Sequence, residues 1–239
     1  MKRVILTLFT AVLPLALTAY AQKPVVEVIR LDGTINPAAS DFIHTAIERT
    51  VEEQAQCLII ELNTPGGLLK STRVIVTDLL TAPIPVIVYV SPGGSQAASA
   101  GVFVALAAHI AAMAPGTNIG AAHPVTIGEG QTQDSVMMGK VTNDAAAFIR
   151  TIAEKRSRNV QWAEEAVRKS VSITETEALK QKVIDYVAKS INDLLGQIDG
   201  KEVETTTGKK TLAVKDSEIR IIPMGWRHKI LNILSDPNI

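Results

Sequence analysis

A serine and a lysine stand out, because the long stretch of chain around the serine carries no cationic side chain until the lysine ends it. Ser99 lies in the sequence Gln-Ala-Ala-Ser-Ala-Gly, and residues 74–139 contain neither Lys nor Arg before Lys140. A lysine amine can act as general base for a serine only when it is held neutral, and burial in an apolar site lowers its pKa accordingly. Met137 and Met138 supply apolar neighbours for Lys140. The pattern predicts a Ser–Lys hydrolase.

Acyl transfer to a serine also needs N–H donors that bind the oxyanion. Ser99 is expected to begin a helix, where free amides and the positive end of the helix dipole gather, so the amide of Ala100 is one expected donor. The second donor is expected from Gly66 and Gly67, because two glycines after a strand let the backbone turn its N–H groups into a cleft.

Each of these features also has an ordinary structural explanation. A serine at a helix start is most often an N-cap, a Pro-Gly-Gly sequence is most often a turn, and a single lysine is most often solvated. Their order along the chain favours a catalytic site. His123 is the competing base. A Ser–His–acid triad needs a carboxylate that orients the imidazole, and the sequence offers no clear candidate, so lysine is favoured over histidine.

Composition excludes several other classes of function. The formal net charge is zero and 20% of the residues are charged, so the chain lacks the basic surplus that nucleic-acid binding requires. Four histidines are scattered without metal-ligand spacing, and the single cysteine, Cys57, lies in an apolar run where we expect a buried small side chain. No metal, cofactor or nucleotide is expected.

The amino-terminal segment is typical of a secretory signal peptide. Lys2 and Arg3 precede an apolar run that is short for a membrane span, and Ala19-Tyr20-Ala21 provides small residues at a cleavage spacing. We expect a signal peptide over residues 1–21, with a short membrane anchor as the alternative. The domain at residues 22–239 is therefore expected on the extracytoplasmic side, in the periplasm or its equivalent.

Apolar β-type runs alternate with helical patterns through the first half of the chain, which predicts an α/β fold with a mostly parallel sheet covered by helices. Strands are expected at residues 25–31, 57–62, 85–90, 110–114, 183–187 and 219–222, helices at 37–51, 68–80, 140–158, 174–182 and 225–234, and a hairpin at 202–214. Residues 126–139 have poor periodicity and are expected to form a flexible flap over the active site.

These motifs, in this order, resemble the NfeD family, or stomatin-operon partner proteins, which are membrane-associated serine proteases. The matching stretches are residues 63–68, 97–101, 113–121 and 177–179. The resemblance implies a Clp-protease/crotonase-like fold of repeated β-β-α and βα units. It also implies that Ser99 is the nucleophile, Lys140 the general base, and Gly67 and Ala100 the oxyanion donors.

The resemblance further implies an ATP-independent endopeptidase that cleaves an apolar segment of a stomatin-like membrane protein and forms a homodimer or a higher homo-oligomer. The expected substrate-binding residues are Gly66, Leu68, Val125, Met137 and Met138. Two alternatives remain. One is a non-catalytic scaffold that binds a stomatin-like protein. The other is a crotonase-type acyl-CoA enzyme, which secretion and the lack of a carboxylate at position 99 disfavour.

The chain departs from the usual family pattern at three positions. Asn63 stands where Asp is usual, Lys182 where a turn glycine is usual, and Glu175 near a usual proline. The first of these bears on the rigidity of the loop that follows it. Many relatives continue past a segment like residues 235–238 into membrane helices and a small β-barrel, so this chain is expected to be a short member or a fragment.

Overall fold

The computed structural model describes residues 23–125, 135–226 and 230–231. The expected signal peptide and residues 126–134 of the expected flap lie outside the described residues. Among the described helices, none combines the length and the apolar composition that crossing a bilayer requires.

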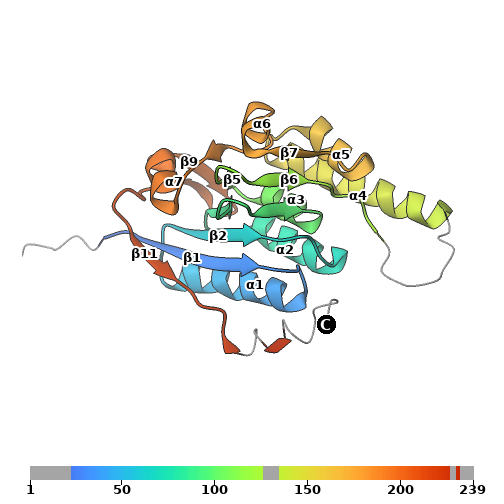
Figure 1. The fold of residues 1–239 in the computed structure, drawn as a ribbon. Helices are drawn as coiled ribbons and strands as arrows, with labels where there is room; N and C mark the ends of the chain where they lie inside the picture. The colour runs from blue at the N-terminus through green and yellow to red at the C-terminus, as the bar shows by residue number, and fades with distance from the viewer. Residues whose placement is uncertain (1–22, 126–134, 227–229, 232–239) are drawn as a thin grey trace, which may run out of the picture.

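The core of the domain is a parallel sheet of six strands in the order β11-β1-β2-β3-β5-β8 (Figure 1). The strands are β1 (Val25–Asp32), β2 (Cys57–Asn63), β3 (Val86–Val90), β5 (Ile110–Met113), β8 (Tyr186–Val187) and β11 (Glu218–Ile221). Every neighbouring pair in this sheet is parallel. Parallel strands need crossover connections, and helices supply most of them here. The predicted parallel α/β architecture is confirmed.

Local sequence signals explain where several helices begin. The helices are α1 (Pro37–Glu52), α2 (Leu69–Thr81), α3 (Ala100–Ala107), α4 (Ser135–Lys155), α5 (Val160–Arg168), α6 (Glu175–Lys180) and α7 (Ile191–Ile198). Asn36 caps α1 by accepting a hydrogen bond from the Ala39 amide at 2.9 Å, and Pro37 occupies the first turn. Thr174 and Glu177 form a capping box at α6.

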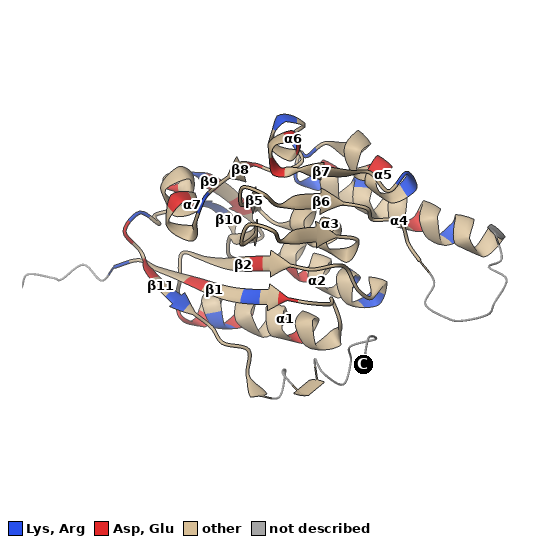
Figure 2. Ribbon diagram, viewed as in Figure 1, with Lys and Arg blue, Asp and Glu red and all other residues tan. Residues whose placement is uncertain are grey.

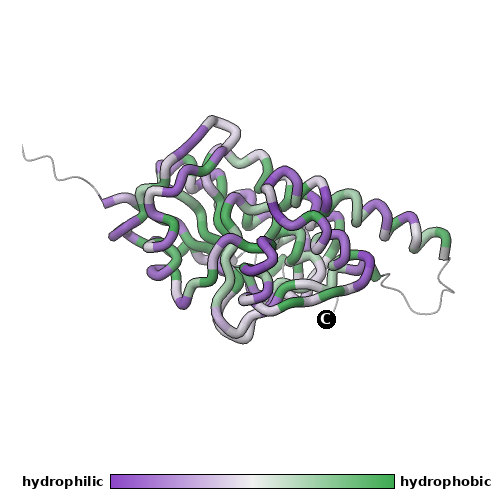
Figure 3. The backbone as a smooth tube through the Cα atoms, turned by 90° about the horizontal axis from the view of Figure 1, so that it is seen from above, coloured by the Kyte–Doolittle hydropathy of each residue, from purple (hydrophilic) through white to green (hydrophobic). Residues whose placement is uncertain are grey.

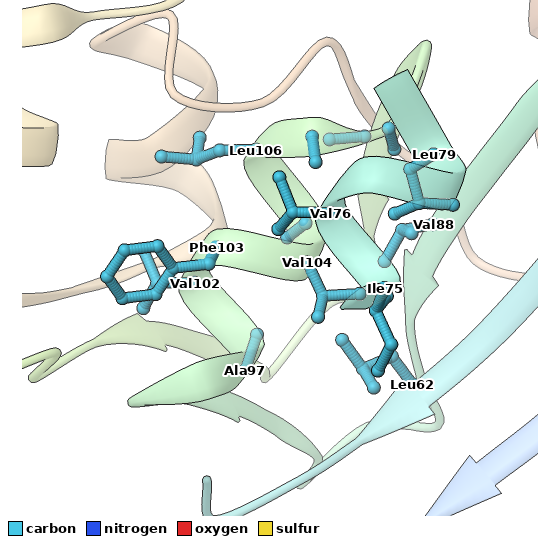
Figure 4. Packing of buried hydrophobic residues seen from close by; sticks show 14 of the residues in the cluster. Leu62, Ile75, Val76, Leu79, Val88, Ala97, Val102, Phe103, Val104 and Leu106 are labelled. Carbon is cyan, nitrogen blue, oxygen red and sulfur yellow. The ribbon is translucent and has the colours of Figure 1, made fainter. Parts of the chain in front are cut away.

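The two faces of the sheet carry separate hydrophobic clusters, because successive strand residues point to opposite sides. On β2, Leu58 and Ile60 belong to the cluster that helices α1 to α5 cover, whereas Cys57 and Ile59 face α7 and the hairpin. Figure 4 shows α2 beside α3 within the first cluster, with Ile75, Val76 and Leu79 on α2 and Val104 on α3. Burial raises the pKa of the Cys57 thiol to about 12, which suits the predicted role of a small apolar side chain.

A second, smaller sheet lies beside the main one and consists of β4 (Gln96–Ala98), β6 (Asn118–Gly120) and β7 (Ser172–Thr174). The bridge between Thr64 and Ala97 joins it to the end of β2. The expected hairpin is present as β9 (Glu202–Thr205) and β10 (Gly208–Thr211). The three short strands of the second sheet were not predicted, because three residues are too few to show an alternating pattern.

Helix α4 begins earlier than expected. Residues 135–139, assigned to the flap from sequence, are helical and precede the predicted helix start at residue 140. Val136, Met137 and Met138 continue the helix, and the single Gly139 is tolerated because one glycine costs a helix only about 1 kcal/mol. Helix α4 extends past the edge of the remaining domain (Figure 1), and its outer end is hydrophobic in Figure 3.

Two other boundaries differ from the sequence predictions. The strand expected at residues 183–187 is confined to β8, and the helices α5 and α7 were not predicted. Charged side chains of both signs are dispersed over the outer elements in the view of Figure 2, in keeping with the zero net charge.

Candidate active site

Ser99 lies on a strained turn between β4 and α3. Its φ of 51° and ψ of −111° fall outside the helical and strand regions, which is rare for a residue with a Cβ atom. The turn is fixed by two backbone hydrogen bonds, from Ser99 N to Gly120 O and from Val102 N to Ser99 O, both 3.1 Å long. The Ser99 side chain makes no capping hydrogen bond. The N-cap explanation therefore does not account for this serine, and its hydroxyl is presented as it is in a nucleophile elbow.

Gly66 and Gly67 form a loop directly opposite Ser99. Their φ angles are 132° and 158°, a region that favours glycine. A Cβ atom on Gly66 would lie 2.7 Å from the Ser99 Cβ, and one on Gly67 would lie 2.1 Å from the Ile35 carbonyl oxygen. Both positions therefore require glycine for close approach as well as for backbone conformation.

The loop leaves one amide free to bind a ligand. Ile35 N donates to Gly66 O and Leu68 N donates to Ile35 O, each at 2.8 Å. The β-bridge between Ile35 and Gly67 is therefore made by the backbone groups of Gly66 and Leu68, and it does not use the Gly67 amide. In the part of the chain that the structure describes, the Gly67 and Ala100 amides have no hydrogen-bond partner. Two free amides beside a serine hydroxyl can bind the oxyanion of a tetrahedral intermediate.

Thr64 braces both loops of the site. Its buried hydroxyl donates to Gly66 O at 3.0 Å and accepts from Gly66 N at 3.1 Å. Its backbone accepts from Ala98 N at 3.0 Å, and its N–H donates to Gln96 O at 2.8 Å. The glycine loop and the strand that precedes Ser99 are therefore fixed to one another.

Asn63 has a structural role that depends on its being an amide. Its Nδ2 donates to Asp32 Oδ1 at 2.8 Å, and its Oδ1 accepts from Gln96 N at 3.1 Å. The side chain thus links β1, β2 and β4. Asparagine supplies here both a donor and an acceptor, whereas an ionised aspartate would face the Asp32 carboxylate. The departure from the usual family residue is accommodated without loosening the loop.

Ser99 opens into a cleft of about 680 Å³. Its lining is mainly apolar and includes Leu68, Leu69, Phe103, Val125, Val141 and Ala145, with Thr34, Thr72 and His123 as further polar members. Of the residues expected to bind substrate, Gly66, Leu68 and Val125 line this cleft, whereas Met137 and Met138 do not. An apolar cleft of this kind can hold an extended apolar peptide against the serine.

His123 is the single titratable side chain among the described residues that line the cleft. Its Nδ1 lies 2.9 Å from the carbonyl oxygen of Val167. Because a carbonyl only accepts hydrogen bonds, Nδ1 must carry the proton. In the described part of the chain, the partner that orients the imidazole is thus a backbone carbonyl and not the carboxylate of a catalytic triad.

Lys140 is not buried, contrary to the sequence prediction. It lies on the exposed side of α4, next to Val141, and is not part of the cleft lining. The apolar neighbours that were expected to bury it are themselves open to solvent, since Val136 is 63% and Met137 58% exposed. No hydrogen bond joins Lys140 to Ser99 among the described contacts. Sequence alone could show an apolar neighbourhood along the chain but could not show which way the helix presents it.

A parallel sheet that places a serine on a strained turn opposite paired glycines defines an α/β domain of the Clp-protease type. The model of the NfeD1b N-terminal domain matches residues 25–221, and the chain belongs to this family. The predicted family and fold are thereby confirmed.

Two curated relatives extend well beyond this domain. The chain is 36% identical over 244 residues to the membrane-bound protease PH1510 of Pyrococcus horikoshii, a match that covers 100% of the chain and 54% of that protein. It is 28% identical over 230 residues to the membrane protein NfeD1b of Bacillus subtilis, covering 96% of the chain and 50% of that protein. The chain thus spans about half the length of both relatives.

Solved structures of the 1510-N membrane-bound stomatin-specific protease are similar throughout. A lysine-to-alanine variant of it, in complex with a substrate peptide, has a TM-score of 0.81 and 35% identity, covering 90% of this chain and 99% of that one. A serine-to-alanine variant has a TM-score of 0.77 and 37% identity, covering 84% and 98%.

Proposed function

We propose that this chain is a serine endopeptidase with Ser99 as nucleophile and Lys140 as general base. The observation that carries the proposal is the strained turn at Ser99, which presents an uncapped hydroxyl to the two free amides of Gly67 and Ala100. A related argument concerns the base. The serine and the lysine substituted in the two 1510-N variants are as far apart in that chain as Ser99 and Lys140 are in this one.

The proposed reaction has two steps, acylation of Ser99 and hydrolysis of the acyl-enzyme. The neutral Lys140 amine takes the proton of the Ser99 hydroxyl as the oxygen attacks the peptide carbonyl, and the Gly67 and Ala100 amides bind the resulting oxyanion. The ammonium then returns the proton to the departing amine, which leaves an acyl-enzyme. The same amine then takes a proton from water as the water oxygen attacks the acyl-enzyme, and the ammonium returns that proton to the Ser99 oxygen as the acid is released. None of these steps needs a nucleotide, and we propose that the peptidase is ATP-independent.

Lys140 must approach Ser99 for this chemistry. Its neighbour Val141 and the later Ala145 line the cleft, so α4 brings the Lys140 backbone next to the cleft although the side chain is exposed. A bound apolar peptide displaces water from the cleft edge, and an amine that swings onto it is favoured in its neutral form because desolvation lowers its pKa.

The apolar lining supports an apolar peptide as substrate, and the specificity of the 1510-N protease for a stomatin homologue supports a stomatin-like membrane protein as its source. We also propose an extracytoplasmic location, from the expected signal peptide, and a homodimer or higher homo-oligomer.

The experiment is cleavage of apolar peptides by purified wild-type chain, Ser99→Ala and Lys140→Ala. Loss of the general base is expected to slow cleavage by about 10²- to 10⁴-fold, and loss of the nucleophile at least as much. Two matched controls are available. Ser157 also has a positive φ, of 54°, and Lys169 is an exposed lysine paired with Glu165, so Ser157→Ala and Lys169→Ala should cleave normally. Wild-type rates in both Ser99→Ala and Lys140→Ala would refute the proposal.

The exposed position of Lys140 also suits the alternative of a non-catalytic scaffold that binds a stomatin-like partner. The same proteins separate the two. A scaffold captures the partner intact with wild type and with Ser99→Ala alike. An enzyme cleaves the captured partner with wild type, and the Ser99→Ala variant retains it uncut.

A further inference from the structure

We propose that Arg73 is a positioning residue for Lys140. It fastens α4 to α2 and it neutralises Asp144, a carboxylate that would otherwise favour the protonated form of the Lys140 amine. This inference rests on the proposed function, because it concerns the base of the same site.

Arg73 makes two contacts with α4 from its place on α2. Its guanidinium carbon lies 4.2 Å from the centroid of the Phe148 ring, and its Nη2 donates to Asp144 Oδ2. Phe148 in turn stacks on Phe103, with ring centroids 5.7 Å apart and planes inclined by 23°. Arg73 on α2, Phe148 on α4 and Phe103 on α3 thus form one chain of contacts between three helices. Two of these helices lie next to the site, because α2 follows the Gly66–Gly67 loop and Phe103 lies one turn beyond Ser99 on α3.

The connection reaches the cleft itself. Phe103 is part of the cleft lining, as is Ala145, which follows Asp144 on α4. A shift of α4 away from α2 would break the Arg73 contacts and move the turn that carries Lys140 away from Ser99. A rigid placement matters here, because misplacing a catalytic group by about 1 Å can cost 10²-fold in rate.

The charge of Asp144 matters separately from the packing. Asp144 follows Lys140 by one helical turn, so the two side chains lie on the same face of α4. A nearby carboxylate favours the charged amine and raises its pKa, which opposes action as a general base. The Arg73 guanidinium engages this carboxylate instead.

Several other charged side chains near Asp144 already have partners of their own. On α5, Glu164 accepts from Arg168 at 2.6 Å and from Arg150 at 2.9 Å, and Arg168 also donates to Asn143 at 2.8 Å. His123 faces the cleft from the loop before residue 126, with its Nδ1 on a backbone carbonyl. Among the described ion pairs, Arg73 is the one partner that neutralises the Asp144 carboxylate.

The test is the pH dependence of kcat and KM for an apolar peptide with the full chain. Arg73→Leu is expected to lower kcat by about 10-fold with little change in KM. It should also raise, by about half a unit, the pKa of the limb on which kcat increases with pH, because that limb reports deprotonation of the general base. Arg73→Leu combined with Asp144→Asn should return that pKa to the wild-type value while kcat stays low. Arg73→Lys keeps the charge and should keep the wild-type pKa.

Arg150→Leu is the matched control, because the Arg150 side chain is also 39% exposed and also pairs with a carboxylate. It should leave the pKa of the profile unchanged. If Arg73→Leu and the double variant both lower kcat by the same factor at every pH and leave the pKa unchanged, Arg73 has only a structural role and the inference is wrong. If Ser99→Ala cleaves at the wild-type rate, the proposed function has failed instead; an inactive Ser99→Ala with unaltered Arg73 variants rejects this inference alone.

Discussion

At the scale of single residues, the site depends on small polar groups that hold the backbone in place. Thr64 bonds both polar groups of Gly66, and Asn63 ties three strands together. The sequence could predict Ser99, Gly66 and Gly67, because their types and order are unusual. It could not predict the role of Thr64, whose importance lies in which atoms come near it after folding.

Replacing Thr64 by valine should weaken both stability and catalysis. Valine keeps the shape and the methyl group but loses both hydrogen bonds to Gly66, and the exposed fraction of this residue is 0%. We expect the free energy of unfolding to fall by about 1–3 kcal/mol and kcat to fall by about 10-fold, because the Gly67 amide is no longer held. Urea unfolding and peptide cleavage measure the two effects.

Thr64→Ser is the control for that substitution. It keeps the hydroxyl and removes only the methyl group that faces Gly101, so it should retain more activity than Thr64→Val. Equal activity in the two variants would show that the hydroxyl does not matter.

A pair of glycine substitutions separates backbone strain from crowding at Ser99, the proposed nucleophile. Gly66→Ala and Gly94→Ala both place a Cβ at positive φ, at 132° and 90°, and each should cost about 1–3 kcal/mol of stability. At Gly66 the Cβ would also lie 2.7 Å from the Ser99 Cβ, whereas at Gly94 no atom lies within 4 Å. Only Gly66→Ala should lose cleavage, measured on samples confirmed as folded. Full activity of that variant would place the reactive serine elsewhere.

At the scale of elements, the sequence predicted the long strands and the helices α1, α2, α3, α4 and α6, whereas the short capped helices α5 and α7 were missed. It missed the short strands β4, β6 and β7, which depend on pairing between distant segments. It also missed the start of α4, because apolar residues beside a glycine were interpreted as a flap. Yet α4 is the element that decides where Lys140 lies.

Helix α5 offers a test of how an element supports the cleft. Asn159 caps it by accepting from Trp162 N at 2.9 Å, and its Nδ2 donates to Gln181 O at 2.9 Å. Asn159→Ala should lower the free energy of unfolding by about 1–2 kcal/mol. Asn159→Asp keeps the cap acceptor and should lose less. The Val167 carbonyl, which orients His123 in the cleft, lies at the other end of α5 from Asn159. The substitution should therefore leave the cleft unchanged, and we expect stability to fall without a loss of cleavage. Equal stability of all three proteins would contradict the cap.

At the scale of the whole molecule, the partly buried histidine that precedes β5, His109, should make stability depend on pH. Burial, with a smaller effect of the nearby Arg156 charge, lowers the pKa of His109 to about 3. Its Nδ1 accepts a hydrogen bond from Val86 N at 3.1 Å and so must be unprotonated. The unfolded chain takes up this proton below about pH 6.5, so the stabilisation is complete above that pH and is lost as the pH falls toward 3.

The expected size of this effect is about 2 kcal/mol between pH 8 and pH 5. Asparagine at position 109 can still accept from Val86 N but does not titrate, so His109→Asn should show a flatter curve of unfolding free energy against pH. Denaturant unfolding at several pH values measures the slope. A variant curve parallel to that of wild type would show that His109 is not responsible.

The direction of the outermost strand pair has a practical consequence for handling the protein. Val25 pairs with Glu218 and Val28 with Ile221, so β1 and β11 run the same way. The described chain therefore enters at the edge where the strands start, and β11 ends at the opposite edge (Figure 1). Strand β2 also ends at that opposite edge, and the Gly66–Gly67 loop beside Ser99 follows it. A bead or sensor chip attached through the amino-terminal side would leave the serine facing bulk solution, whereas attachment just after β11 would turn it toward the support and hinder bulky substrates.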